Sequence, residues 1–311
     1  WGRPYLDAYN NVPHVGHSHP RIRNAALEQL KKLNSNTRYL HPKQSDLAES
    51  ILSKLPETFK VCYFVNSGSE ANELALRLAR EHTKAKGMIT MDHGYFGNTT
   101  GAIDISAYKF NKPGGVGQPD WLELVEIPDD YRGAYKKEDP NRGEKFAGQI
   151  NQAIEKLKSK NQNLCGFIAE TFPSVGGQII TPPGYLAEVY RQIRESGGVC
   201  IADEVQTGLG RLGNHYFGFE YQKVCPDIVV LGKPIGNGHP VGVVATTKEI
   251  ANNFDNGIEF FSTFGGSTLS CAIANEVIEI VEDESLQSNA RKMGEKLKTG
   301  LKNLQNKYES I

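Results

Sequence analysis

Two side chains that could do chemistry stand where apolar, strand-like runs end. Lys233 follows Ile228–Leu231 and opens a loop rich in glycine and proline, and Asp203 closes Val199–Asp203. A lysine kept away from water has a lowered pKa and can attack a carbonyl carbon. A buried aspartate needs a cation or a strong donor beside it. Taken singly, such a lysine is usually solvated at the surface, and such an acid usually caps a helix or pairs with a cation at the surface. We favour this ordinary interpretation for Glu204, the residue after Asp203.

A third feature is the stretch NSGSEAN, which joins a strand-like run to a helical one. Ser67, Gly68 and Ser69 have small side chains, so backbone N–H groups at a helix start can approach an anion closely. Alone, the stretch fits an ordinary capped helix equally well. Together with Lys233 and Asp203 it supplies what pyridoxal phosphate requires: phosphate donors, a carboxylate for the pyridine nitrogen and an amine for the aldehyde.

Tyr95, in HGYFGNT after another strand-like run, offers an aromatic ring to stack on that cofactor. Two other patterns are set aside. Gly208–Gly213 matches GxGxxG, but no helical pattern follows, so we do not expect a dinucleotide site. His17 and His19 lack a third ligand at a suitable spacing, and we predict no metal site.

The elements that must position these residues are apolar runs that alternate with amphipathic ones. Continuous apolar runs indicate strands buried on both faces, so we predict an α/β fold with a mainly parallel sheet covered by helices. We expect seven strands, at Val61–Asn66, Met88–Asp92, Leu122–Ile127, Gly166–Glu170, Val199–Asp203, Ile228–Leu231 and Val241–Thr246. We expect helices in SEANELALRLAR (capped by Ser67 or Ser69, with Gly87 as stop signal), Glu144–Lys158, Gly184–Ser196, Ser270–Glu282 and Leu286–Lys307.

Composition narrows the class of partners. The 35 Lys and Arg against 36 Asp and Glu give a formal net charge of −1, which gives no reason to expect nucleic acid or an anionic membrane as partner. No apolar run is long enough to span a bilayer. The five cysteines lie mostly in apolar runs without a CxxC pair, which favours reduced thiols in a cytoplasmic protein. No signal peptide precedes Trp1, and both termini are open to being incomplete.

The chain divides into three regions on these patterns. We expect an N-terminal segment at 1–45 and a large cofactor-binding domain at 46–265. After Thr263–Gly266 the strands stop and two helical patterns follow. Residues 266–311 are therefore predicted to be helices that lead into a truncated C-terminal small domain.

These residues fall in blocks that resemble the class III pyridoxal-phosphate-dependent aminotransferases. The blocks are NSGSEAN, HGYFGNT, DEVQTGLGRLG, LGKPIGNGHPVG and STFGG, and they follow the family's order over roughly the whole chain. Five ordered blocks are far more specific than one motif. The resemblance implies the type I fold of pyridoxal-phosphate-dependent transferases, with a seven-stranded large domain and part of a smaller C-terminal domain.

The resemblance also implies a role for each matching residue. Lys233 matches the lysine that forms a Schiff base with the cofactor, and Asp203 matches the partner of the pyridine nitrogen. Thr263 matches a threonine that binds the cofactor phosphate of the neighbouring subunit, which implies a homodimer with shared sites. The other implied cofactor contacts are Gly68 and Ser69 at the phosphate (to which we add Ser67), Tyr95 and Val205 on the two faces of the ring, Gln206 near the ring hydroxyl and Glu170 in the active site.

The reaction is less constrained than the family. The family reaction moves an amino group from a primary amine to a keto acid through a Schiff base on Lys233. Within the family, NNVPHVGHSHP, ISAYKF and ETFPSVGGQIITPPGY are most similar to the amine phospho-lyases. The alternative is therefore elimination of phosphate and ammonia from phosphoethanolamine or phosphohydroxylysine, and a third is a catalytically silent regulatory homologue. Arg38 and Lys109 are candidate phosphate partners, against the ordinary interpretation of solvated surface charge.

Two departures from the family bear on the substrate. Val175 stands where many members carry a second glutamate, which argues against an ornithine-type scheme with two alternating substrates. The family's substrate-carboxylate arginine lies beyond Ile311. The amine, the acceptor and any assembly beyond a dimer stay open.

Overall fold

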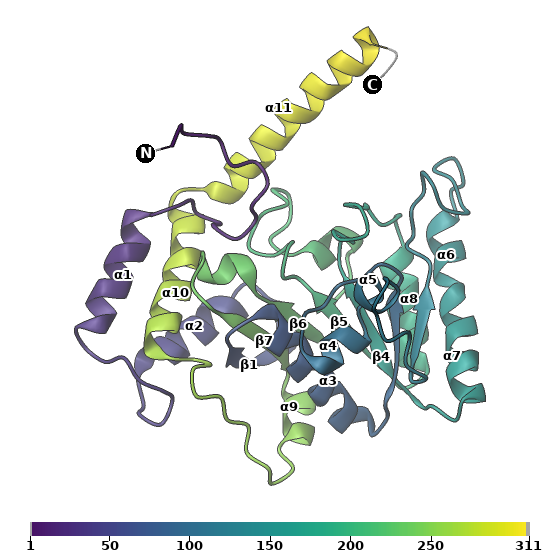
Figure 1. Ribbon diagram of the computed structural model, residues 1–311, viewed down its shortest axis with the longest axis horizontal. Coiled ribbons are helices and arrows are strands. Elements are labelled where there is room, and N and C mark those ends of the chain that lie inside the picture. The colour runs from purple at the N-terminus through teal and green to yellow at the C-terminus, as the bar shows by residue number, and fades with distance from the viewer. Residues whose placement is uncertain (1, 309–311) are drawn as a thin grey trace.

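A computed structural model gives the fold for residues 2–308, and its centre is a seven-stranded sheet (Figure 1). The strand order is β1-β7-β6-β5-β4-β2-β3; β7 runs antiparallel to β1 and β6, and the other pairs are parallel. The strands are β1 Phe59–Val65, β2 Gly87–Met91, β3 Leu122–Val125, β4 Leu164–Glu170, β5 Val199–Asp203, β6 Ile228–Leu231 and β7 Gly242–Thr247. The predicted α/β class and all seven predicted strands are confirmed.

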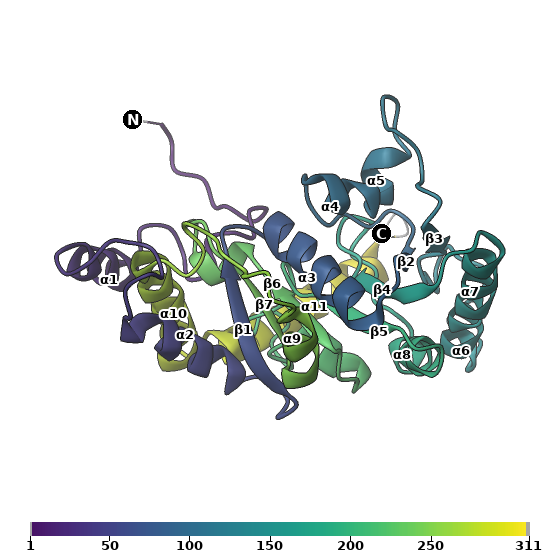
Figure 2. The ribbon, with the colours of Figure 1, turned by 90° about the horizontal axis from the view of Figure 1, so that it is seen from below.

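Helices cover both faces of the sheet (Figures 1 and 2). On one face, α3 (Gly68–Thr83) crosses the middle strands and α9 (Lys248–Phe254) packs on β1 and β7. On the other, α2 (Pro42–Leu52) and α10 (Thr268–Asp283) cover one end, and α7 (Gln149–Ser159) and α8 (Tyr185–Glu195) cover the other. The apolar strands are therefore buried on both sides, as their continuous runs predict.

Helix α3 begins as predicted and ends differently. Ser67 caps it, because its side chain accepts a hydrogen bond from the Glu70 N–H at 3.2 Å. Its last turn is closed by Lys84 in the left-handed region, at φ 53°, and not by Gly87. Gly87 instead opens β2, where a Cβ atom would lie 2.6 Å from the Asn163 carbonyl oxygen. The glycine therefore serves strand packing, and the predicted stop at Gly87 is wrong.

The remaining predicted helices form with small changes of boundary. The stretch predicted as Glu144–Lys158 is two helices, α6 (Arg142–Ala147) and α7, that meet at Gly148. Helix α11 spans Leu286–Lys307, as predicted, and none of its residues is buried. It extends away from the sheet (Figure 1). Of the described residues, no helix is long and apolar enough to cross a membrane.

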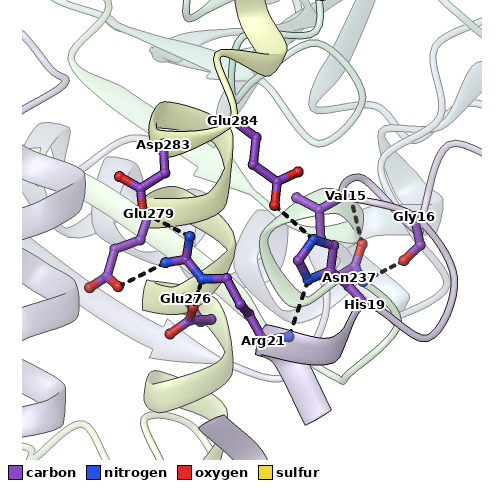
Figure 3. A network of polar contacts seen from close by, with 9 residues as sticks. All are labelled: Val15, Gly16, His19, Arg21, Asn237, Glu276, Glu279, Asp283 and Glu284. Carbon is purple, nitrogen blue, oxygen red and sulfur yellow. Dashed lines mark hydrogen bonds and ion pairs between the residues drawn. The ribbon is translucent and has the colours of Figure 1, made fainter. Parts of the chain in front are cut away.

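Two helices near the N-terminus were not predicted. Helix α1 (Pro20–Leu30) and α2 both start at a His-Pro pair, where the histidine accepts a hydrogen bond from the second helical N–H and proline takes the first position. His19, set aside above as a metal ligand, is the cap of α1 and contacts Glu284 at 3.1 Å. Arg21 of α1 contacts three acids of α10: Glu276, Glu279 and Asp283 (Figure 3). These contacts attach α1 to α10.

Candidate active site

The candidate site lies where β4, β5 and β6 end, at the carboxyl edge at which open α/β sheets hold ligands. Glu170 ends β4 and is paired in register with Asp203, which ends β5. Lys233 begins the short helix η2 (Lys233–Gly236) just after β6. A cavity of about 210 Å³ opens there. Of the predicted residues, it is lined by Gly68, Ser69, Tyr95, Glu170, Asp203, Val205, Gln206 and Lys233.

Asp203 is buried and has two protein donors. Its Oδ2 accepts from Asn72 Nδ2 at 2.8 Å, and its Oδ1 accepts from the Val205 N–H at 2.9 Å. Burial raises the pKa of Asp203, while these hydrogen bonds and the charge of Lys233 act in the opposite direction. Among the described residues, no cation lies within ion-pair distance of this carboxylate. The cavity therefore presents an acceptor that a cationic ligand group would complete.

Asn72 is a site residue that sequence reasoning missed. It sits on the buried side of α3, and its Nδ2 also donates to the Phe96 carbonyl at 2.9 Å. It thereby joins the helix, the loop after β2 and the Asp203 carboxylate. The one available signal was an amide on an otherwise apolar helix face, which indicates a buried polar contact but not its partner.

Lys233 has a strained backbone, with φ at 33° in a region that favours glycine. Gly232 before it has little room for a side chain, because a Cβ atom would lie 3.1 Å from the Gly68 nitrogen. Pro234 after it is buried. The neighbours thus hold the half-buried lysine at the cavity against its conformational preference. Strain of this kind is typical of functional positions.

The start of α3 forms a close-packed cradle. A Cβ atom on Gly68 would lie 3.0 Å from Val205, and one on Gly97 would overlap Ser69 at 2.4 Å. Ser69 Oγ accepts from the Asn98 N–H at 3.1 Å. Glycine at these two positions lets backbone and hydroxyl groups approach an anion at a helix N-terminus. Ser67, predicted as a cofactor contact, caps α3 and does not line the cavity.

Glu170 is buried beside Asp203 and accepts backbone hydrogen bonds from two loops. The donors are the N–H groups of Tyr95 at 3.2 Å, Ser174 at 3.0 Å and Val175 at 3.5 Å. Burial, and next the charge of Asp203, raise the pKa of Glu170 to about 7, although these donors act in the opposite direction. The carboxylate therefore ties the loop that carries Tyr95 to the loop after β4.

Glu204 differs from the prediction. It is fully buried rather than paired at the surface, and it accepts four hydrogen bonds. The donors are the hydroxyls of Thr171 (2.7 Å) and Thr207 (2.6 Å) and the N–H groups of Gly218 (2.8 Å) and Phe219 (2.9 Å). The last two open helix η1 (Gly218–Gln222), so a capping role holds and the surface ion pair is wrong.

A wider outer pocket of about 830 Å³ adjoins the cavity and shares four lining residues with it: Tyr95, Ser174, Gln206 and Lys233. Lys109 lines it, with Nζ 5.5 Å from the centre of the Tyr95 ring. Val175 also lines it. Arg38 and Thr263 are exposed and lie outside both sets of lining residues: Arg38 stacks on Phe261 at 5.3 Å, and Thr263 lines a separate pocket with Asn34 and Phe264.

The residues present fit pyridoxal phosphate. The cavity joins a buried carboxylate that lacks a cation, a half-buried amine, an aromatic ring and a helix start free of bulky side chains. Asp203 would meet the pyridine nitrogen, Lys233 the aldehyde, and Gly68 and Ser69 the phosphate. No other described cavity combines these groups.

Comparison with known proteins gives consistent results. The family model described as aminotransferase class-III matches residues 2–311. "Alanine–glyoxylate aminotransferase 2-like" of Drosophila melanogaster is 47% identical over 314 residues, covering 100% of this chain and 64% of the relative. "Ethanolamine-phosphate phospho-lyase homolog 1" of Caenorhabditis elegans is 40% identical over 318 residues, covering 99% of this chain and 68% of the relative. The chain thus spans about two thirds of these relatives.

Two solved structures are similar over almost the whole chain. A phospholyase from Arthrobacter in complex with phosphoethanolamine is 37% identical, with a TM-score of 0.89 and coverage of 96% of this chain and 70% of that one. An amine transaminase from an uncultivated Pseudomonas species in its PLP-bound form is 28% identical, with a TM-score of 0.87 and coverage of 96% and 71%. These matches confirm the type I fold.

The cofactor is pyridoxal 5′-phosphate, as the sequence predicts. The human relative named "Alanine–glyoxylate aminotransferase 2, mitochondrial" is 37% identical over 332 residues, covering 100% of this chain and 64% of the relative. Because this relative is named as mitochondrial, the cytoplasmic location of this chain stays a prediction. The domain boundaries and the homodimer stay predictions as well. With the family model matched over residues 2–311 and the cofactor-binding groups gathered in one cavity, the chain belongs to the class-III aminotransferase family.

Proposed function

We propose that this chain carries the active site of an amine phospho-lyase that acts on a small phosphorylated amine such as phosphoethanolamine. The observation that supports this is the charge of the outer pocket. Lys109 and Lys233 are the charged side chains among its described lining residues, and no aspartate or glutamate is among them. An anionic group that enters the outer pocket therefore meets two cations, and no carboxylate lines that pocket itself.

Lys233 and Asp203 do the work common to both candidate reactions. When bound, pyridoxal phosphate supplies an aldehyde that condenses with an amine and a ring that draws electrons from the carbon bearing it. The Lys233 amine would take the proton from that carbon as a general base. Asp203, as a carboxylate at the cavity, would hold a proton on the ring nitrogen. Glu170 holds the backbone of Tyr95 and of Ser174 in place around them.

The two reactions differ in what leaves the substrate. In the elimination, the C–H bond next to nitrogen breaks and its proton passes to Lys233. The C–O bond on the neighbouring carbon then breaks, and its electron pair leaves on phosphate. Water releases ammonia and a carbonyl compound afterwards. Lys109, in the outer pocket, neutralises part of the charge on the departing phosphate.

Transamination is the second candidate, and the 47% identity to a relative named as an aminotransferase supports it. In that case a keto acid is the acceptor, and its carboxylate takes the place of phosphate beside Lys109. Val175 lines the same pocket, so the loop after β4 lacks the second glutamate that, by the family resemblance, helps a dual-substrate enzyme switch between substrates. The pocket therefore suits one anionic substrate better than two of different charge.

The test is to give the purified enzyme phosphoethanolamine without a keto acid. Sustained release of inorganic phosphate, many times the enzyme concentration, supports the lyase. Lys109→Ala should raise the KM for phosphoethanolamine by roughly tenfold, as expected for loss of a charged contact. Lys112→Ala is the matched control, since Lys112 lies over the Tyr108 ring, 3.5 Å from its centre, and is not itself among the residues that line the pocket. Product that forms only after a keto acid is added would establish transamination instead.

We further propose that the enzyme is a homodimer in which Thr263 reaches the cofactor phosphate of the partner. The supporting observation is that Thr263 is exposed and lies outside its own chain's cavity, while the neighbouring Phe261 and Phe264 are also exposed. Co-expression of Lys233→Ala and Thr263→Ala chains tests this. A mixed dimer keeps one site with both residues intact, so it should regain activity that neither variant has alone. A monomer by sedimentation would refute it.

A further inference from the structure

The N-terminal strap, residues Ala8–Gly16, lies at the outer pocket and contacts the segment that follows Asp203. Residues 8–11 of the strap line that pocket. Its course is irregular, so its position depends on contacts with the rest of the chain. Each of these contacts is made to residues about 200 positions away in sequence. The strap has two local hydrogen bonds, from the Val12 N–H to Asn10 Oδ1 and from the Gly16 N–H to the Pro13 carbonyl, and its contacts with distant segments place it against the fold.

Backbone contacts dock the strap at two points. Arg211 Nη2 donates to the Asn11 carbonyl at 2.7 Å and to His14 Nδ1 at 3.0 Å, and the His14 Nε2–H donates to the Leu209 carbonyl at 2.8 Å. Asn237 accepts from the Val15 N–H at 2.9 Å and donates to the Gly16 carbonyl (Figure 3). The glycine run that imitates a dinucleotide motif thus presents Leu209 and Arg211 to the strap.

One side chain of the strap contacts a residue that lines the cofactor cavity. Asn11 Nδ2 donates to Gln206 Oε1 at 2.5 Å, and Gln206 lines both the cavity and the outer pocket. An amide has an oxygen that accepts and an NH2 group that donates. Because Asn11 engages the oxygen, Gln206 presents its Nε2 donors on the other side of the amide. A ligand oxygen can receive them, whereas a ligand N–H cannot.

We propose that Asn11 is a positioning residue that acts through Gln206. By engaging Oε1, it fixes the Gln206 amide with its donors available to an oxygen of the bound cofactor, such as the ring oxygen beside the aldehyde. The strap thereby couples cofactor binding to the wall of the outer pocket, whichever reaction follows. Arg211 and Asn237 hold the strap, and Asn11 transmits its position.

A double-mutant cycle on cofactor affinity tests the route. Asn11→Ala should raise the dissociation constant of pyridoxal phosphate by roughly three- to tenfold, the range of one hydrogen bond. In a Gln206→Ala background the same change should have less than about a twofold effect, because the residue through which it acts is gone. An unaltered dissociation constant in Asn11→Ala, or an equal effect in both backgrounds, would overturn the proposal.

Exchange of the Val15 amide hydrogen separates this role from simple undocking. The Val15 N–H donates to the Asn237 side chain, so the protection of this amide from hydrogen exchange reports whether the strap is docked. We expect protection to be retained in Asn11→Ala while affinity falls. If affinity falls only in variants that also lose this protection, Arg211→Ala among them, the whole strap and not Asn11 is responsible, and the proposal fails.

The absorption spectrum of the bound cofactor gives a readout of amide orientation. Asn11→Asp keeps the shape but offers only acceptors, so it attracts Gln206 Nε2 and turns the amide away from the ligand oxygen. The midpoint of the spectral pH titration of the bound cofactor should rise by roughly half to one pH unit, because the anionic ring oxygen loses a hydrogen-bond donor that stabilised it. Asn10→Asp places the same charge one residue away, where the side chain bonds the Val12 N–H. An equal shift in Asn10→Asp would attribute the effect to charge alone and refute the proposal.

Discussion

The titration of Glu170 gives a quantitative test of the cavity's electrostatics. Its pKa is raised from 4.5 to about 7, first by burial and then by the charge of Asp203. Between these pH values the folded chain keeps a proton that the unfolded chain has lost, so stability falls as pH rises through this range. The difference between the two pKa values corresponds to roughly 3 kcal/mol of unfolding free energy, fully lost above about pH 7.

Urea unfolding of the cofactor-free enzyme between pH 4.5 and 8 measures this. Glu170→Gln cannot ionise, so the unfolding free energy of the wild type minus that of the variant should decrease by roughly 3 kcal/mol as pH rises. Groups elsewhere titrate equally in both proteins and cancel. A difference that stays constant or increases with pH would refute the argument.

A second substitution separates the two causes. Asp203→Asn removes the charge that acts on Glu170 but leaves it buried. In that background the pH range of the stability change should move to lower values, yet stay above 4.5, because burial is the larger cause. No movement would show that the two carboxylates do not interact.

Three further predictions follow from packing and charge. Gly97→Ala should lower the melting temperature and weaken cofactor binding, because its Cβ would lie 2.4 Å from Ser69. Gly294→Ala is the control: its Cβ would point into open space on α11, so calorimetry should show a protein stabilised by about 0.5–1 kcal/mol. Glu204→Ala leaves four buried donors without their acceptor and should cost at least about 3 kcal/mol in urea unfolding, with a smaller loss in Glu204→Gln. Burial, and next the charge of Arg211, lower the pKa of His14 from 6.5 to about 4. Strap docking should therefore weaken as pH falls from 6.5 to 4, which faster proteolysis of the N-terminal segment would reveal. The substitution His14→Gln should remove that pH dependence.

The apolar pattern predicted the sheet because a strand buried on both faces is a continuous apolar run, which is visible in the local sequence. All seven strands were found from continuous apolar runs. The clustering of Asp203 and Lys233 followed from one rule, that parallel strands end at the same edge, whereas Glu170 was identified only through the family resemblance. Helices α1 and α2 were missed because their apolar stripes are weak, although the sequence contains the His-Pro pairs that cap them. Their stability comes from packing against α10, which a local pattern does not contain.

Polar contacts between distant segments were the part that sequence could not supply. Asn11 and Gln206 are 195 positions apart, and neither residue type specifies the other. Asn72 reaches Asp203 across 131 positions from a helix face that otherwise looks apolar. Each contact depends on where whole elements lie, so its partners become identifiable only after the fold is known.

The three buried acids at the strand ends show why residue type alone does not assign roles. Glu204 has four donors, and Glu170 has three backbone N–H groups, so the protein itself satisfies both. Asp203 has two donors and faces the cavity without a cation within ion-pair distance among the described residues. Adjacent acids in DEV are indistinguishable by composition. The number of donors around each carboxylate separates the one that still needs a ligand cation from the two that hold loops in place.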